Sequence, residues 1–133
     1  MIDITIPGAP VAKGRGRATR TGRVFTPAKT RKAEETLSAR AMALLAGVEG
    51  LPLAGPLHLE ATFTSTVPAS WPAKKRAAAV APTSRPDVDN LLKLATDALN
   101  GIVWVDDAQI VTVVCRKVYG DAPSTRLVVR SAP

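Results

Sequence analysis

Apolar and polar residues alternate along several stretches of the chain, and a two-residue period is typical of a β-strand with one buried face. The alternation is clearest in IDITI near the start and in LHLEATFTST near the middle. Two later runs, QIVTVVCRKVY and TRLVVR, are rich in β-branched apolar residues, which also favour strands. We therefore predict four strands, at residues 2–6, 57–66, 109–119 and 125–130.

Other stretches repeat their apolar residues with the 3.6-residue period of a helix that buries one face. The first of them has Thr26 as a natural N-cap and Pro27 at the first helical position. The second is short and basic, with Ser70 as its N-cap and Pro72 in its first turn. We predict helices at residues 27–46, 68–81 and 88–100.

Taken together, the elements follow the order β-α-β-α-α-β-β, which predicts an α+β fold with a small mixed β-sheet packed with helices. A chain of 133 residues is long enough for one hydrophobic core, and we find no internal repeat or linker that would divide it. We therefore expect a single domain over residues 1–133. Trp71 and Trp104 are expected in its core rather than as platforms for base stacking.

The chain carries a formal net charge of +7, and its positive charge is concentrated near the N-terminus. Residues 13–32 hold eight basic side chains and no acidic one, in a Gly- and Thr-rich context that favours a flexible or hairpin loop. Such a segment is either a solvated loop or an arm that contacts nucleic-acid phosphates. The predicted DNA-contacting residues are Lys13, Arg15, Arg17, Arg20 and Arg23 in this segment, and Lys74, Lys75 and Arg76 in the short helix.

Two classes of site are disfavoured by the composition. The single cysteine, Cys115, cannot close an internal disulfide, and one cysteine with one histidine is too few for a zinc site. No apolar run reaches the roughly 18 residues of a membrane span, and the start of the chain lacks a signal-peptide pattern. We therefore expect a cytoplasmic protein that uses neither zinc nor a membrane.

Acidic residues gather between residues 87 and 107, although the chain as a whole is basic. Helical spacing places Asp89, Lys93 and Asp97 on one face, opposite the apolar face that packs. A purely structural explanation is open, because Asp favours helix N-termini and i,i+4 ion pairs stabilise exposed helix faces. The other explanation is a divalent-cation site, since clustered carboxylates repel one another and Mg²⁺ prefers hard oxygen ligands. The candidates are Asp87, Asp89, Asp97, Asp106 and Asp107.

One segment of the chain resembles the signature of a known family. The segment RPDVDNLLKLATDALNGIVWVDDAQI, residues 85–110, closely resembles the signature of the RusA family of Holliday junction resolvases. The pattern is Asp-x-Asp-Asn, a lysine four residues after the second Asp, Asp-Ala-Leu-Asn, and an aromatic residue shortly before Asp-Asp. Two flanking stretches, PGAPVAKGRGR with VFTP and SWPAKKRAAA, also resemble bacterial members of the family.

This resemblance implies a homodimeric endonuclease, often carried by phages and prophages, that acts in DNA recombination and repair. Such enzymes use Mg²⁺, which Mn²⁺ can replace, to cut four-way DNA junctions with paired symmetric nicks. The metal ligands would fall on Asp87, Asp89 and Asp107, with Asp106 as the alternative to Asp107. Lys93 would be the catalytic lysine beside the scissile phosphate, and Asp97 would have at most a supporting role.

Three other functions remain open from the residues alone. A non-catalytic basic module that binds nucleic acid would explain the arm, although the acidic cluster would repel DNA. Sugar and nucleotidyl transferases also use Asp-x-Asp, usually at a strand end with a donor pocket. A family member that binds junctions without cutting them is the third. Only the resolvase would cut a junction, and only a transferase would consume an activated donor.

Overall fold

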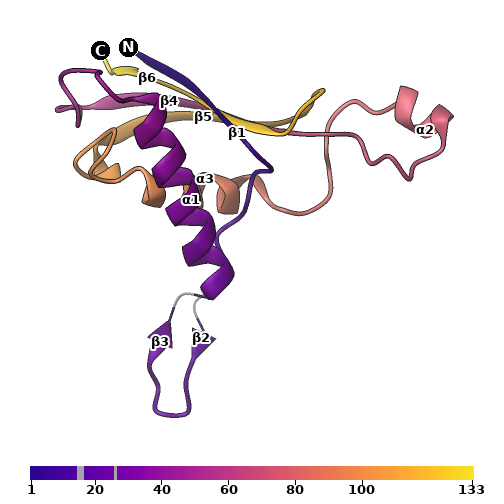
Figure 1. The fold of residues 1–133 in the computed structure, drawn as a ribbon, viewed down its shortest axis with the longest axis horizontal. Coiled ribbons are helices and arrows are strands. Elements are labelled where there is room, and N and C mark those ends of the chain that lie inside the picture. The colour runs from indigo at the N-terminus through magenta and orange to yellow at the C-terminus, as the bar shows by residue number, and fades with distance from the viewer. Residues whose placement is uncertain (15–16, 26) are drawn as a thin grey trace.

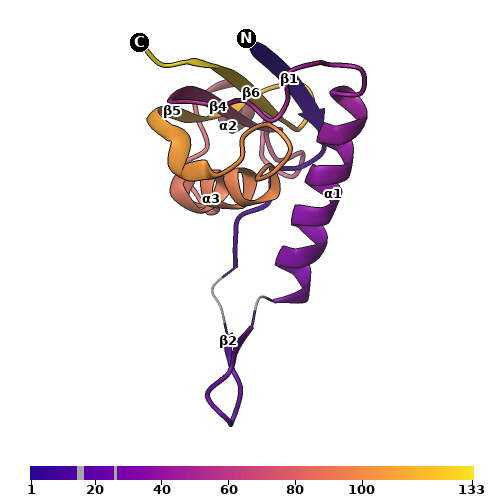
Figure 2. The ribbon, with the colours of Figure 1, turned by 90° about the vertical axis from the view of Figure 1, so that its left-hand side faces the viewer.

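A computed structural model of the chain describes residues 1–14, 17–25 and 27–133. Four strands form a mixed sheet in the spatial order β1-β6-β4-β5, in which only the β4–β5 pair is parallel (Figure 1). Both longer helices lie on the same face of this sheet (Figure 2). The α+β fold with a small mixed sheet is therefore confirmed. The elements of this layer are β1 (Ile2–Pro7), α1 (Ala28–Leu44), β4 (Leu57–Ser65), α3 (Val88–Ala98), β5 (Ile110–Tyr119) and β6 (Ser124–Ser131).

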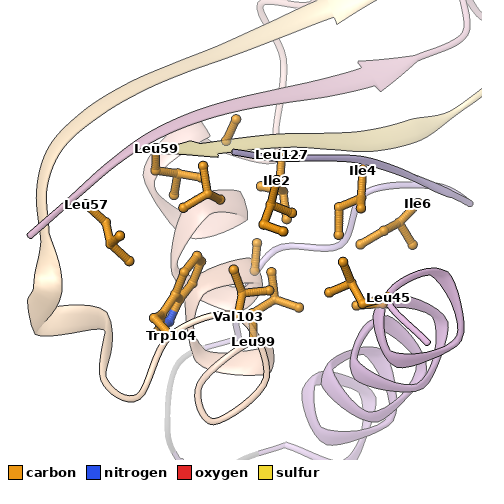
Figure 3. Close-up of a cluster of buried hydrophobic side chains, with 14 of the residues drawn as sticks. Ile2, Ile4, Ile6, Leu45, Leu57, Leu59, Leu99, Val103, Trp104 and Leu127 are labelled. Atoms are coloured by element: carbon orange, nitrogen blue, oxygen red, sulfur yellow. The ribbon is translucent and has the colours of Figure 1, made fainter. Parts of the chain in front are cut away.

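The hydrophobic core lies between the sheet and the two helices (Figure 3). Alternate residues of β4 point into it, as the two-residue period predicts, and Leu57 and Leu59 are fully buried. Trp104 is fully buried in this core, and its Nε1–H donates a hydrogen bond of 2.8 Å to Asn100 Oδ1. Each such large apolar side chain contributes about 1.5–3 kcal/mol on burial. The core thereby holds α3 and the turn after it against the sheet.

Polar side chains occupy the opposite face of the sheet. Asp3 on β1 accepts two hydrogen bonds from the Arg126 guanidinium on β6, at 3.0 and 2.8 Å. This pairing lowers the pKa of Asp3 below its usual value. Arg130 is exposed on the same face, because its neighbour Val129 points into the core. Among the residues that the structure describes, no helix covers this face in either view (Figures 1 and 2).

The short basic helix differs from its prediction. It spans only Ala73–Ala77 (α2) and begins after Pro72, so Ser70 is not its N-cap. Proline disfavours the helical conformation for the residue before it, which prevents the helix from starting at Trp71. Trp71 is only half-buried and packs edge-on against Tyr119, with ring centroids 6.3 Å apart, so its predicted place in the main core is wrong. In the described ranges, no helix is long and apolar enough to cross a membrane.

The basic segment near the N-terminus contains a two-stranded hairpin that projects from the body of the molecule below α1 (Figures 1 and 2). Its strands are β2 (Arg17–Ala18) and β3 (Val24–Phe25). The turn is closed by a hydrogen bond of 2.7 Å from Thr19 N to Arg23 O, and Gly22 adopts a φ of +82° that favours glycine. Of the two predicted alternatives, the hairpin is therefore the one observed. The predicted N-cap Thr26 lies outside the described residues, and Pro27 occupies the N-cap position of α1.

Candidate active site

The N-terminus of α3 presents Asp87 and Asp89 to solvent. Asp87 occupies the N-cap position, yet its side chain accepts no capping hydrogen bond from the described residues. Only its backbone carbonyl takes part in the helix, accepting a bond of 3.1 Å from Leu91 N. Both carboxylates are exposed, and the apolar face of the helix is buried behind them. The capping explanation therefore does not account for the Asp87 side chain, which is available for a ligand.

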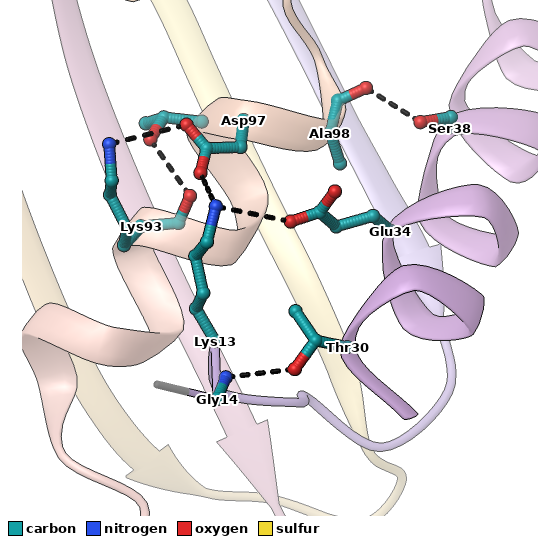
Figure 4. Close-up of polar contacts among 9 residues, drawn as sticks. Lys13, Gly14, Thr30, Glu34, Ser38, Lys93, Asp97 and Ala98 are labelled. Carbon is teal, nitrogen blue, oxygen red and sulfur yellow. Dashed lines mark hydrogen bonds and ion pairs between the residues drawn. The ribbon is translucent and has the colours of Figure 1, made fainter. Parts of the chain in front are cut away.

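One turn further along α3, Lys93 and Asp97 form an ion pair on the polar face (Figure 4). Lys93 Nζ lies 3.3 Å from Asp97 Oδ1, and the Lys93 side chain remains 58% exposed. The other carboxylate oxygen of Asp97 accepts a hydrogen bond from the Lys13 ammonium group. That hydrogen bond is the main cause of a raised pKa for Lys13, which therefore stays protonated. Asp97 thus contacts a lysine through each of its two oxygens.

Asp106 and Asp107 follow α3 but have different surroundings. Asp106 caps the short 3₁₀ helix η1 (Asp107–Gln109), because its Oδ1 accepts a bond of 3.0 Å from Ala108 N. This bond is the main cause of a lowered pKa for Asp106. Gln109 completes a capping box by accepting the Asp106 N–H at 3.0 Å. The Asp-x-x-Gln spacing is a known capping-box signal, so the sequence already contained this structural role for Asp106.

Asp107 is the member of the pair whose pKa is influenced by charges on α3. Burial is the largest influence on its carboxyl and raises its pKa, and a hydrogen bond with Asp106 adds to this effect. The Lys93 charge acts in the opposite direction, and the Asp97 charge is also close enough to be felt. Because Asp106 is engaged as a cap, Asp107 is the member of the pair that is not committed to the backbone of η1.

The oxygen donors that these residues offer can be compared with the ligands that a divalent cation needs. Within residues 1–14, 17–25 and 27–133, no three Asp, Glu, His or Cys side chains lie close enough to hold one ion together. The structure therefore does not bring Asp87, Asp89 and Asp107 into a single three-carboxylate cluster. Mg²⁺ is commonly bound by one or two carboxylates, with water and substrate phosphate completing its shell. The exposed, hard oxygen donors on α3 fit that kind of site.

A groove of about 1050 Å³ runs beside the N-terminus of α3. Arg85 and Asp87 line one wall, residues 9–14 form another, and Lys29 of α1 contributes a positive charge. Its described lining extends to Gly14, in the segment that precedes β2. An extended polyanion lying in the groove would pass between this segment and Asp87.

The predicted DNA contacts fall into three environments. Arg20 and Arg23 are exposed at the tip of the hairpin, whereas Arg15 and the side chain of Arg17 lie outside the described residues. The basic residues of α2 are exposed beyond the end of the sheet (Figure 1), and one of them stacks on Trp71 with its Nζ 4.1 Å from the ring centroid. Lys13 differs from the others because Asp97 and Glu34 engage its ammonium group. The three residues on α2 are Lys74, Lys75 and Arg76.

Sequence reasoning did not find the contacts of Lys13 with Asp97 and Glu34. These residues lie far apart in the chain, and only the packing of the segment before the hairpin between α1 and α3 brings them together. No local spacing signals such a contact.

Comparison with known proteins adds two findings. A family model described as "Endodeoxyribonuclease RusA" matches residues 7–130. A curated relative, "Uncharacterized protein YqaN" of Bacillus subtilis (strain 168), is 30% identical over 141 aligned residues. The alignment covers 97% of this chain and 95% of the relative. The match of the family model includes α3, η1 and the segment that leads to the hairpin.

Proposed function

The chain belongs to the RusA family of endodeoxyribonucleases, and from that premise we propose that it is a Mg²⁺-dependent enzyme that cuts four-way DNA junctions. Cutting would occur by paired, symmetric phosphodiester hydrolysis, in DNA recombination and repair. The observation that carries the proposal is the polar face of α3. There an exposed lysine, Lys93, follows Asp89 by one turn, and the start of the same helix borders a groove lined by the segment that precedes the basic hairpin.

In phosphodiester hydrolysis, the lysine of the site would stabilise negative charge and the aspartates would bind the metal ion. The Lys93 ammonium group can donate hydrogen bonds to non-bridging phosphate oxygens and stabilise the negative charge that develops on them. Asp87, Asp89 and Asp107 are the proposed metal ligands, with Asp106 kept in its capping role. Because the three do not meet around one point, one or two of them would bind the ion, and water and the DNA phosphate would complete its shell. When bound, Mg²⁺ would supply Lewis acidity at the phosphate, and Mn²⁺ would serve the same ligands.

Binding and symmetry follow from the remaining features. Arg20 and Arg23 of the hairpin would contact phosphates without reading sequence, and the basic residues of α2 would add a second contact. A homodimer would present two copies of the site to the two strands that must be cut in a two-fold symmetric junction. The predicted partners are thus branched DNA and a second copy of the chain.

The test is cleavage of a synthetic four-way junction in about tenfold excess of linear duplex, which removes binding by bulk charge alone. Each of the four strands is end-labelled in turn, and the protein is incubated with Mg²⁺ or with EDTA. We expect nicks at symmetric positions in two opposing strands, with Mg²⁺ only. Asp89→Asn should abolish the nicks and leave junction binding intact.

A matched variant, Glu49→Gln, removes one carboxylate in the exposed turn after α1 and should cut normally. Tight binding without nicks in Mg²⁺ would contradict the proposal. That result would favour the second candidate, a non-catalytic nucleic-acid-binding module. The observation in its favour is that no three acidic side chains in the described part of the chain group around one point.

A further inference from the structure

We propose that Lys13 is a positioning residue that keeps the Lys93 side chain free to reach a phosphate. The proposal rests on the endonuclease function proposed above and gives Lys13 a role other than DNA contact. Its basis is the Asp97 carboxylate, which lies between the two lysines (Figure 4). Lys13 hydrogen-bonds to one oxygen of Asp97, and Lys93 Nζ lies 3.3 Å from the other.

Hydrogen bonds to both longer helices hold the backbone around Lys13. Lys13 N donates a bond of 3.0 Å to Asn90 O at the start of α3, and Gly14 N donates one of 2.9 Å to Thr30 Oγ1 on α1. Thr30 is buried, and a Cβ on Gly14 would lie only 2.7 Å from its Oγ1. These contacts fix Lys13 between the two helices at the root of the arm.

A second acidic residue holds the Lys13 ammonium group in place. Glu34 Oε1 on α1 lies 3.5 Å from Lys13 Nζ. This oxygen is shielded from solvent and accepts no hydrogen bond from any described residue, so the neighbouring ammonium group is what compensates its burial. Two carboxylates therefore compensate the positive charge of Lys13, so its ammonium group attracts a DNA phosphate only weakly.

The consequence for Lys93 follows from competition for one carboxylate. With Lys13 present, Asp97 offers Lys93 a single oxygen, and the Lys93 side chain stays 58% exposed. Without Lys13, both oxygens of Asp97 and its full charge would act on Lys93. A charge-assisted pair of that kind is stronger, and it would hold the exposed Lys93 ammonium group against Asp97 instead of leaving it free for a phosphate. A small displacement of a catalytic group is enough to slow a reaction greatly.

Three roles for Lys13 predict different kinetics. A phosphate contact would raise KM and the junction Kd and would flatten the salt dependence of binding. A merely structural role would lower the melting temperature and the fraction of active enzyme. A positioning role lowers kcat and leaves KM, Kd and the salt dependence unchanged.

The experiment compares Lys13→Gln with Lys13→Arg and with Arg130→Gln, which removes a positive charge from the opposite face of the sheet. We expect Lys13→Gln to lower kcat about tenfold or more, since a misplaced ammonium group loses contact with the transition state. KM and Kd should stay within about twofold, because the exposed arginines still bind the phosphates. Lys13→Arg should recover most of the rate, and Arg130→Gln should match the wild type.

Adding Asp97→Asn to Lys13→Gln makes the test sharper, because it removes the carboxylate for which the lysines compete. The double variant should lose less rate than the product of the two single losses. Multiplicative losses, or a raised Kd with unchanged kcat, would overturn the proposal.

A second readout does not depend on cleavage. Trace acetylation followed by mass spectrometry measures the reactivity of the Lys93 amine, which should fall in Lys13→Gln and recover in the double variant. Unchanged reactivity would refute the positioning role even if the enzyme cuts junctions. If the wild type fails to cut, the proposed function fails, and this labelling still decides the role of Lys13.

Discussion

Replacing Gln109 tests how much the turn around η1 contributes to the stability of the protein, and whether that turn also supports cleavage. Its Oε1 accepts the N–H groups of Val105 and Asp106 at 2.9 and 3.0 Å. Its Nε2 donates to Leu53 O and Gly55 O, both at 3.0 Å. One side chain therefore joins the turn that carries Asp107 to the loop before β4.

Gln109→Ala removes all four of these hydrogen bonds. Three of the four bonds are exposed, so we assign each of the four about 0.5 kcal/mol, the low end of the usual range. The four bonds together then contribute about 2 kcal/mol to the free energy of unfolding. For a chain of this length that loss corresponds to a decrease of about 7 °C in Tm. Because η1 positions Asp107, the cleavage rate should fall further than the loss of folded protein explains.

Urea denaturation followed by circular dichroism measures the free energy of unfolding. Gln109→Glu is the matched variant, because it keeps the two acceptor contacts but cannot donate to Leu53 O and Gly55 O. We expect it to destabilise the protein as well, since its carboxylate faces two carbonyl oxygens. A free energy of unfolding for Gln109→Ala within about 0.5 kcal/mol of wild type would refute this reasoning.

Three further predictions concern the core, the hairpin and the thiol. Trp104→Ala should cost about 3–5 kcal/mol in the free energy of unfolding, because the ring is fully buried, and a loss below about 1 kcal/mol in urea denaturation would contradict the described core. Arg20→Ala combined with Arg23→Ala should weaken junction binding and reduce its salt dependence, as measured by fluorescence anisotropy at several salt concentrations; unchanged binding would show that the hairpin is not the arm. Burial raises the pKa of the Cys115 thiol, so iodoacetamide should label it slowly at pH 8 and quickly in urea, and equal rates would contradict its half-buried position on β5.

The sequence determined much of the fold because local periodicity is strong in this chain. The alternation within residues 57–66 and the apolar face of residues 88–100 both gave elements close to those observed. Trp104 was correctly expected in the core. The parallel pairing of β4 with β5 was not predicted, because the intervening helices must first pack and no local pattern encodes the strand order.

The errors at α2 and Trp71 have a local cause. Ser70 is a good capping residue by type, but Pro72 prevents a helix from starting before it. Trp71 lies in the proline-rich segment that leads into α2, and it packs on Tyr119 at the end of β5 instead of reaching the core. Residue type alone suggested both predictions, and the neighbouring prolines overrode it.

The candidate site was predictable in its residues and less so in its contacts. The sequence placed Asp89, Lys93 and Asp97 on one exposed face, and the structure agrees. The convergence of the N-terminal segment on Asp97, by contrast, depends on tertiary packing between α1 and α3. The choice between Asp106 and Asp107 as a ligand remains a prediction, and the capping box at Asp106 supports Asp107.

Cleavage of a supercoiled plasmid that extrudes a cruciform tests the central claim most directly. Paired nicks across the four-way junction convert the plasmid to a linear form, whereas unpaired nicking gives only open circles. We predict linear product in Mg²⁺, none in EDTA, and none with Lys93→Met, a variant that keeps the length of the side chain without its charge. Open circles alone, or linear product that persists with Lys93→Met, would contradict a junction endonuclease whose chemistry lies on the polar face of α3.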